Sequence, residues 1–174
     1  MAATAIITGG TGGLGAAVTT EFIGRGWRVV VPWVAEQERD RLQSLPELAS
    51  AGDRLLLVRA DLFDAGEVAG VAELAGAEPN APLGAVINLV GGFAMHGRIH
   101  ETPIETFEQQ LRLNLRPTYL VSAAALPSLL ERGEGAIVCV STRAALRPFA
   151  GAAGYITAKA AVLAFVDALA AEYT

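Results

Sequence analysis

The 174-residue sequence has a single cysteine, no run of apolar residues long enough to span a membrane, and no basic segment at its N-terminus. One cysteine cannot form a disulfide within the chain. Cys139 lies in the apolar run GAIVCVS, which favours a place in the core over a nucleophilic role. The missing apolar run and basic segment argue against a membrane partner and a signal peptide, so a cytoplasmic protein is predicted.

The sequence also lacks a net positive charge and any cluster of typical metal ligands. The net charge of −5 argues against a nucleic-acid partner. No cluster of cysteines and histidines suggests a metal site. Hydrophobic residues, in contrast, make up 52% of the chain, which is ample for one core. We therefore expect residues 1–174 to form a single domain without a metal.

Glycine is concentrated in TGGTGGLG, residues 8–15, which contains five glycines. The apolar segment ATAIIT before it predicts a strand, and LGAAVTTEFIGRGW after it has helical spacing that ends near Gly24 and Gly26. The glycines therefore lie in a strand-to-helix turn, where free N–H groups of the helix can face a phosphate that no side chain blocks. The turn predicts dinucleotide binding; the alternative is a tight turn in another α/β fold.

Strands and helices alternate along the rest of the chain. Further strands are predicted over residues 27–33, 53–61, 82–92 and 135–142. Further helices are predicted over residues 35–49, 64–76, about 106–132, with irregularities at Pro117 and Pro127, and 153–174. The strands are near-continuous apolar runs, as in a parallel sheet covered on both faces. Right-handed crossovers then give a doubly wound, Rossmann-like α/β fold with strand order 3-2-1-4-5.

Candidate site residues fall at the carboxyl ends of the predicted strands, where open α/β sheets bind ligands. They are the glycine turn, Asp61, Gly91 and Thr142. In the last predicted helix, Tyr155 and Lys159 are four residues apart and share one face. A neighbouring ammonium lowers the pKa of a tyrosine from its ordinary value near 10, so Tyr155 is expected to exchange a proton with a carbonyl or alcohol. The alternative is a chance spacing of two residues on a helix.

These segments together resemble the short-chain dehydrogenase/reductase family. TGGTGGLG matches the family's TGxxxGxG turn, and NLVG at residues 88–91 stands where the family usually has NNAG. Asn114 in RLNLRP is similar to the family's helix asparagine, and ST at residues 141–142 stands where a serine pair often occurs. Tyr155 and Lys159 match the YxxxK motif. The order and spacing of all five agree across essentially the whole chain.

The resemblance implies a role for each matched residue. Tyr155 would be the general acid/base, Lys159 would bind the nicotinamide ribose and lower the tyrosine pKa, and Asn114 would hold a water of the proton relay. Thr142, where the family usually has serine, would position the substrate carbonyl, and its methyl group is expected to narrow the fit. The implied coenzyme-binding residues are Gly9, Thr11, Gly12, Gly13, Leu14, Gly15, Asp61, Leu62, Asn88, Gly91, Tyr155 and Lys159.

The sequence leaves the coenzyme open between NAD and NADP. An acidic residue after the second strand would bind the ribose 2′-hydroxyl of NAD, and a basic one would favour the 2′-phosphate of NADP. Trp33 occupies the expected place, with Glu36, Arg39 and Arg41 nearby.

The resemblance also implies that the natural protein is longer than this sequence and that it forms an oligomer. The family usually continues with two further strands and a substrate-covering loop, whereas this sequence stops at LAAEYT. We expect the natural protein to be longer, since the fifth strand would otherwise leave an open apolar edge. The two long helices resemble the family's dimer-forming pair, which implies a homodimer or homotetramer.

The sequence thus predicts an NAD(P)(H)-dependent oxidoreductase that moves hydride between nicotinamide and a carbonyl or secondary alcohol. The substrate is either a 3-oxoacyl thioester or a pteridine, because NLVGGF and GAAGYITAKAAV are also similar to dihydropteridine reductase. Arg143 and Arg147 either attract an acidic substrate or lie on the surface, and His96 and His100 either line the entrance or lie in a solvated loop. The rival interpretation is a non-catalytic nucleotide-binding or regulatory protein of the same fold.

Overall fold

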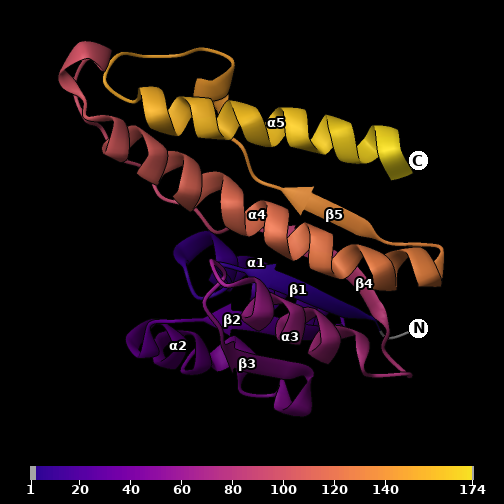
Figure 1. The fold of residues 1–174 in the computed structure, drawn as a ribbon. Coiled ribbons are helices and arrows are strands. Elements are labelled where there is room, and N and C mark those ends of the chain that lie inside the picture. Colours follow the sequence, from indigo (N-terminus) through magenta and orange to yellow (C-terminus); the bar gives the residue numbers. More distant parts are fainter. Residues whose placement is uncertain (1–2, 174) are drawn as a thin grey trace. The chain divides into compact units, whose positions relative to one another are not determined.

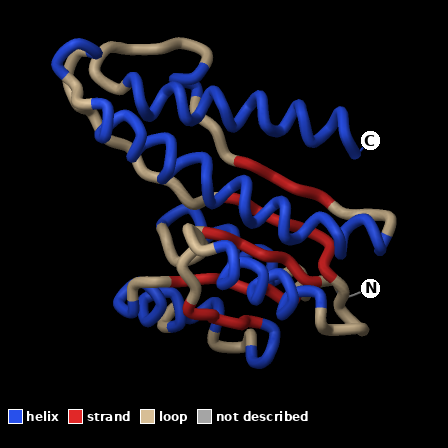
Figure 2. Tube along the Cα trace, viewed as in Figure 1, coloured by secondary structure: helices blue, strands red, loops and turns tan. Residues whose placement is uncertain are grey.

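The computed structural model describes residues 3–173, in which strands and helices alternate (Figures 1 and 2). The strands are β1 (Thr4–Thr8), β2 (Arg28–Trp33), β3 (Leu55–Arg59), β4 (Leu83–Asn88) and β5 (Ala136–Cys139). The helices are α1 (Gly13–Gly24), α2 (Glu36–Gln43), α3 (Ala65–Gly76), α4 (Ile104–Arg132) and α5 (Ala153–Tyr173).

Contacts within the chain group into two compact units. The first unit comprises the residues up to Leu89 together with Leu120–Val138, and the second comprises Val90–Tyr119 together with the residues from Cys139 onward. The expectation of a single domain stays a prediction.

The strands form one sheet in the order β3-β2-β1-β4-β5, which confirms the predicted Rossmann-like order. The β1–β2, β1–β4 and β2–β3 pairs are parallel, and Ile6 stands beside Val30 on one side and Val86 on the other. This order puts β1 and its glycine turn at the centre of the sheet.

The core of the first unit lies on both sides of the central strands. Every residue of β1 and β4 is buried. Odd-numbered residues of β1, β2 and β4 pack with Ile23 of α1 and Leu42 of α2. Residues alternate across a strand, so the even-numbered residues point to the opposite face, and α3 contacts β1 and β2. Within the first unit, α1, α2 and α3 therefore flank the sheet, as predicted.

The two strands at the ends of the sheet, β3 and β5, are less buried than the central strands. Residues of β3 are mostly half-buried, and those of β5 alternate between exposed and half-buried. The expectation that every strand is covered on both faces is therefore wrong for these two. Among residues 3–173, each end strand has a neighbouring strand on one side only.

Several predicted boundaries also differ. β4 ends at Asn88 rather than at residue 92, and β5 ends at Cys139 rather than at residue 142. The helix expected over 35–49 ends at Gln43 and is followed by a separate 3₁₀ turn, Pro46–Leu48. Proline removes an N–H and pushes the preceding residue into an extended conformation, which Leu45 adopts. A 3₁₀ turn at Gly52–Arg54 delays the start of β3, which ends at Arg59 rather than at Asp61.

Asp64 caps α3 as predicted, since its carboxylate accepts hydrogen bonds from the N–H groups of Gly66 and Glu67.

The positions of the two long helices, α4 and α5, were predicted to within a few residues. The 29-residue helix α4 continues through Pro117 and Pro127, so the irregularities expected at these two prolines do not interrupt it. The predicted last residue of the final helix, Thr174, lies outside the described residues.

Helix α5 corrects the expectation that no segment is long and apolar enough to cross a membrane. By length and composition alone α5 suffices, with a mean hydropathy of 1.5 over its most apolar window. The sequence-based argument counted charged residues as interruptions, but Lys159 and Asp167 are too few to lower the average of this alanine-rich helix.

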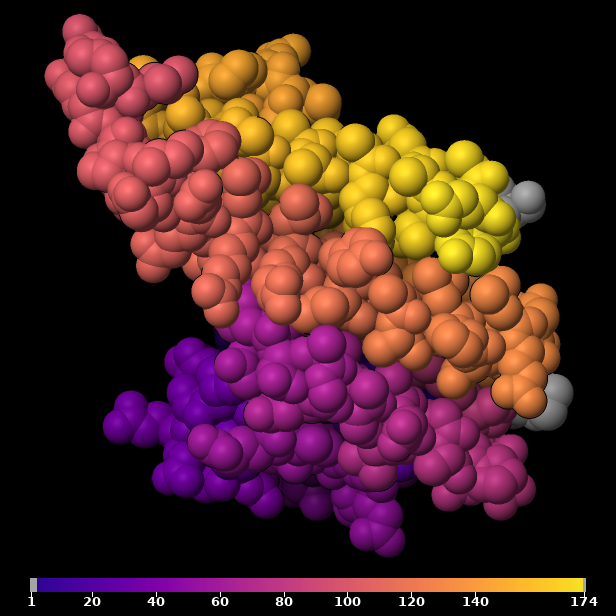
Figure 3. Space-filling view, viewed as in Figure 1, coloured from indigo at the N-terminus to yellow at the C-terminus, as the bar shows by residue number. Residues whose placement is uncertain are grey.

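In the second unit, the beginning of α5 packs closely on α4. A Cβ added to Gly154 would lie 3.1 Å from Cβ of Gln110 and 3.3 Å from Cα of Phe107. Farther along, the rings of Tyr119 and Phe165 have centroids 5.8 Å apart. Figure 3 shows the side chains of α5, in yellow, meeting those of the first half of α4. This packing fixes the helix face that carries Tyr155 and Lys159.

Candidate functional site

The glycine turn after β1 brings the start of α1 close to the strand. Gly9 has φ of +65°, a left-handed conformation that favours glycine, and its carbonyl accepts a hydrogen bond of 3.0 Å from the N–H of Gly12. A Cβ added to Gly15 would lie 1.9 Å from the same carbonyl oxygen. Only glycine fits at position 15 without moving the main chain.

Gly13, two residues before Gly15, has free space around it where Gly15 has none. A Cβ on Gly13 would meet no described atom within 4 Å, so this side of the turn is open. Gly12 begins α1 without any described side chain as a cap, and the first turn contains no acidic residue. The free N–H groups and the helix dipole at this end favour an anion. The turn therefore fits the pyrophosphate of a dinucleotide.

Thr11 connects the turn to α2. It is buried, and its Oγ1 donates a hydrogen bond of 2.9 Å to Oε2 of Glu38. Nη2 of Arg41 donates a bond of 2.9 Å to the carbonyl of Thr11. The guanidinium of Arg39 lies 4.6 Å from the centre of the Trp33 ring and pairs with Asp40 at 2.6 Å. An acid and a base thus both reach the turn, and the choice between NAD and NADP stays open.

The other predicted coenzyme residues of the first unit lie at the ends of β3 and β4. Oδ1 of Asp61 accepts a hydrogen bond of 2.9 Å from the N–H of Phe63, and Leu62 is buried. Nδ2 of Asn88, also buried, donates a bond of 3.1 Å to Oγ of Ser122. Asn88 therefore ties β4 to the second half of α4.

The candidate catalytic residues belong to the second unit, and Asn114 is the most buried of them. Its Oδ1 accepts a hydrogen bond of 3.0 Å from the N–H of Gly92, and its Nδ2 donates bonds to the carbonyls of Gly92, at 3.0 Å, and Gln110, at 3.1 Å. A Cβ on Gly91 would lie 2.6 Å from Oδ1 of Asn114 and 3.1 Å from Nζ of Lys159. The structure thus brings Asn114 and Lys159 together around Gly91.

Lys159, the only lysine in the sequence, is 7% exposed. Its Nζ donates a hydrogen bond of 2.9 Å to the carbonyl of Val140, and its own carbonyl accepts one of 2.7 Å from Oγ of Ser141. Burial lowers the pKa of Lys159 below its ordinary value of 10.5, and the nearby Cys139 opposes this shift. The segment after β5 therefore holds the ammonium in place.

Thr142 and Tyr155 complete the predicted catalytic set. Oγ1 of Thr142 accepts a hydrogen bond of 3.3 Å from the N–H of Ala144 and so caps a short 3₁₀ turn, Arg143–Ala145. Tyr155 lies in the first turn of α5, one turn before Lys159, and its ring contacts Phe93 with a centroid distance of 5.0 Å.

The comparison with known proteins identifies the family. The profile of the family described as "short chain dehydrogenase" matches residues 3–174. The chain belongs to the short-chain dehydrogenase family. It is a family of NAD(P)-dependent oxidoreductases, as the resemblance in the sequence predicted.

Similar proteins include dehydrogenases and a ketoreductase. This short-chain dehydrogenase is 34% identical to 2-(R)-hydroxypropyl-CoM dehydrogenase of Xanthobacter autotrophicus, covering 99% of this chain and 69% of the relative. It is 38% identical to the "Inactive 2-(S)-hydroxypropyl-CoM dehydrogenase 2" of the same organism, covering 81% of this chain and 60% of the relative. The solved structure of F189W actinorhodin polyketide ketoreductase with NADPH has a TM-score of 0.88 at 25% identity, covering 99% of this chain and 65% of that chain. The chain thus spans about two thirds of the length of these proteins.

Sequence reasoning missed two groups of residues in this short-chain dehydrogenase. Glu38 was passed over because a surface helix of alternating charges gives no sign of which acid reaches Thr11. Phe93 and Phe149 were passed over because they lie in loops without periodicity; the one available signal was that Phe93 directly follows Gly91 and Gly92. His96, His100, Arg143 and Arg147 are all exposed.

Proposed function

We propose that this short-chain dehydrogenase transfers hydride between a nicotinamide coenzyme and a carbonyl or secondary-alcohol substrate. The observation that carries the proposal is the arrangement of Asn114, Gly91 and Lys159, with Tyr155 one helical turn from the buried ammonium. The open glycine turn of the first unit supports NAD(P) as the coenzyme, which supplies or accepts the hydride when bound.

The protein residues would handle the proton and hold the substrate. Tyr155 would donate its phenolic proton to the oxygen of the reduced carbonyl, while the hydroxyl of Thr142 holds that oxygen. The ammonium of Lys159 is removed from bulk water and would stabilise the phenolate that Tyr155 becomes. Asn114 would keep the backbone at Gly92 in place and orient a water that returns the proton.

The test compares two tyrosines of the same helix. Tyr155→Phe should lower the turnover of NADH or NADPH with a carbonyl substrate by about 10²–10⁴-fold, the range of general acid–base catalysis. Tyr173→Phe, at the exposed end of α5, should leave turnover unchanged. Coenzyme binding, followed by nicotinamide fluorescence, should be similar in both variants. Equal turnover of Tyr155→Phe and the wild type would remove Tyr155 from the mechanism.

A non-catalytic nucleotide-binding protein is the second candidate. The name of the 38% identical relative, which calls that protein inactive, favours it. A sensor should bind coenzyme without oxidising it in the presence of any carbonyl tested. The titration with NADH and NADPH that detects binding also ranks the two coenzymes, and Glu38→Gln should improve NADPH binding if Glu38 repels the 2′-phosphate.

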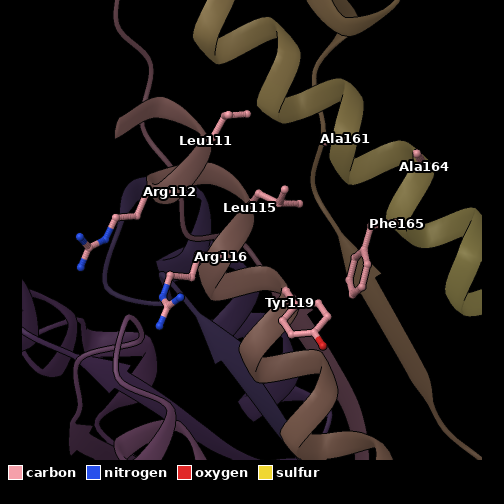
Figure 4. A pocket seen from close by; sticks show the side chains of 8 residues that line it. All are labelled: Leu111, Arg112, Leu115, Arg116, Tyr119, Ala161, Ala164 and Phe165. Carbon is pink, nitrogen blue, oxygen red and sulfur yellow. The ribbon is translucent and has the colours of Figure 1, made fainter. Parts of the chain in front are cut away.

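We also propose that copies of this chain associate through α4 and α5 into a homodimer or homotetramer. A groove of about 860 Å³ lies between the two helices in the second unit. Leu111, Leu115 and Tyr119 project from α4 toward α5, whereas Arg112 and Arg116 point away (Figure 4). In analytical ultracentrifugation, Ala161→Arg in this groove should lower the assembly mass, while Ala69→Arg on the exposed face of α3 should not.

The substrate proposals are a 3-oxoacyl thioester and a pteridine, and the cytoplasm is the proposed location. A panel of such substrates with either coenzyme tests the first point. Microscopy of a fluorescent fusion in living cells tests the second.

A further inference from the structure

Three exposed, large apolar side chains lie on the loops that precede α4 and α5, and one of them, Phe93, contacts the ring of Tyr155. The ring of Phe93 meets Tyr155 edge-on, with centroids 5.0 Å apart and an interplanar angle of 81°. The ring of Phe93 also meets the ring of Phe149, with centroids 6.2 Å apart and an interplanar angle of 61°. Met95 follows Phe93 two residues later, and its Cε lies 3.0 Å from where a Cβ on Gly151 would stand. We call Phe93, Met95 and Phe149 the aromatic wall.

Hydrogen bonds fix the two loops that carry this wall. Asn114 holds both the N–H and the carbonyl of Gly92, directly before Phe93. The N–H of His96 donates a bond of 2.8 Å to the carbonyl of Gly151, and so joins the loop of Met95 to the loop of Phe149. The hydroxyl of Thr102 donates a bond of 2.9 Å to the carbonyl of His96. The wall is therefore held by paired backbone groups.

All three side chains of the wall are exposed to solvent. Phe93 is 57% exposed, Met95 58% and Phe149 47%. Large apolar side chains that are exposed together mark a binding surface more often than chance. Here one of them, Phe93, contacts Tyr155, the side chain that the proposed function assigns to proton transfer. A substrate that presents its carbonyl oxygen to Tyr155 would lay its substituent against this wall.

We propose that the substrate of this site is a carbonyl compound, or the matching alcohol, with a flat aromatic or conjugated ring next to the reacting carbon. The inference rests on the proposed function and names its substrate class. Aromatic rings favour edge-to-face and offset contacts with Phe93 and Phe149, and a thioether favours the edge of a ring. A flexible alkyl chain would also bury apolar area against this wall, but it would make neither of these directional contacts.

The experiment uses Met95 as a probe of the wall. The sequence contains two methionines, so a chain labelled with ¹³C-methyl methionine gives two methyl signals, and Met95→Leu assigns one of them. Acetophenone and cyclohexyl methyl ketone share one carbon skeleton and differ only in the ring. Each is titrated into the full chain in the presence of NADPH and, separately, of NADH. The aryl ketone should shift the Met95 signal saturably and bind about two- to ten-fold tighter, the range of aromatic pairs beyond buried area.

Leucine variants connect this preference to the wall. Phe93→Leu and Phe149→Leu keep an apolar side chain and should each bring the ratio of the two dissociation constants toward one. Phe63→Leu, in a turn of the first unit, should leave the ratio unchanged. An amide spectrum of each variant checks that the fold is kept.

The outcomes separate this inference from the proposed function. Equal binding of the two ketones, an unchanged ratio in both wall variants, or no shift of Met95 with either ketone would overturn the substrate class. If both ketones are reduced by a Tyr155-dependent reaction with equal affinity, the proposed function stands and this inference fails. A clear aryl preference without turnover under either coenzyme would support the wall and overturn the proposed function.

Discussion

Replacing Gly15 with alanine tests whether the glycine turn depends on the close approach of α1 to β1. The added Cβ would lie 1.9 Å from the carbonyl oxygen of Gly9 and 2.6 Å from Cα of Gly10. An ordinary contact between carbon and oxygen is about 3.3 Å or more, so the helix would have to move by more than about 1 Å. Both obstacles are main-chain atoms, which cannot rotate away.

We expect Gly15→Ala to lower the free energy of unfolding by about 3 kcal/mol or more, the upper end of the cost of overpacking. For a chain of this size, about 2–4 °C of Tm correspond to each kcal/mol, so Tm should fall by about 6–12 °C. Nicotinamide coenzyme binding should weaken in parallel, because the same movement displaces the N–H groups that face the phosphate.

Gly24→Ala in the same helix is the matched control. A Cβ there meets no described atom within 4 Å, and alanine in a helix is about 0.5–1 kcal/mol more favourable than glycine. Tm should therefore stay or rise by a few degrees. Thermal unfolding followed by circular dichroism measures both variants. A Gly15→Ala chain as stable as the control would refute the close approach.

Three further variants probe the second unit. Gly91→Ala should reduce turnover more than coenzyme affinity, because its Cβ would displace Oδ1 of Asn114 and Nζ of Lys159; steady-state kinetics and fluorescence titration measure the two. Asn114→Asp should destabilise the chain by about 1–3 kcal/mol in urea unfolding, since an oxygen would replace the donor to two carbonyls. The ¹³C signal of the only lysine should titrate below pH 10.5, and Cys139→Ser should lower the pKa of Lys159 further, because the thiolate raises it. The folded state releases this proton at a lower pH than the unfolded state does. The contribution of Lys159 to the free energy of unfolding should therefore increase as the pH rises from its folded pKa toward 10.5. A titration midpoint of Lys159 at or above 10.5 would contradict its burial.

Most of the fold could be predicted from the sequence because each central strand is a continuous apolar run bounded by turn residues. β1, β4 and the helix over residues 64–76 agree with their predicted positions to within a few residues. The errors have local causes. Pro46 and the left-handed Gly52 divide a segment that helical spacing alone joins to its neighbours. The lower burial of β3 and β5 was missed although the predicted order placed both at the ends of the sheet, because an apolar run was taken by itself as a sign of cover on both faces.

The candidate site was predictable where a residue type has few alternatives. Gly15 and Gly91 each stand where a Cβ would meet main chain or a buried side chain, so glycine itself is the signal. Glu38 and Phe93 carry no such signal, because an exposed acid or aromatic residue fits many places in a chain. Their importance comes from contacts across the chain, with Thr11 and with Tyr155, that spacing does not reveal.

The burial of the only lysine has a chemical consequence. Apart from two histidines, all other basic side chains of this protein are arginines, so Lys159 is the only side-chain amine that can be acylated, and its burial shields it from reagents. It lies inside the candidate site, hydrogen-bonded to Val140, and not on the surface. Side-chain acetylation would therefore not accumulate over many positions of this protein, as it does in lysine-rich enzymes. It would first require the segment around Lys159 to open, and it would then remove the ammonium charge beside Asn114 in a single event.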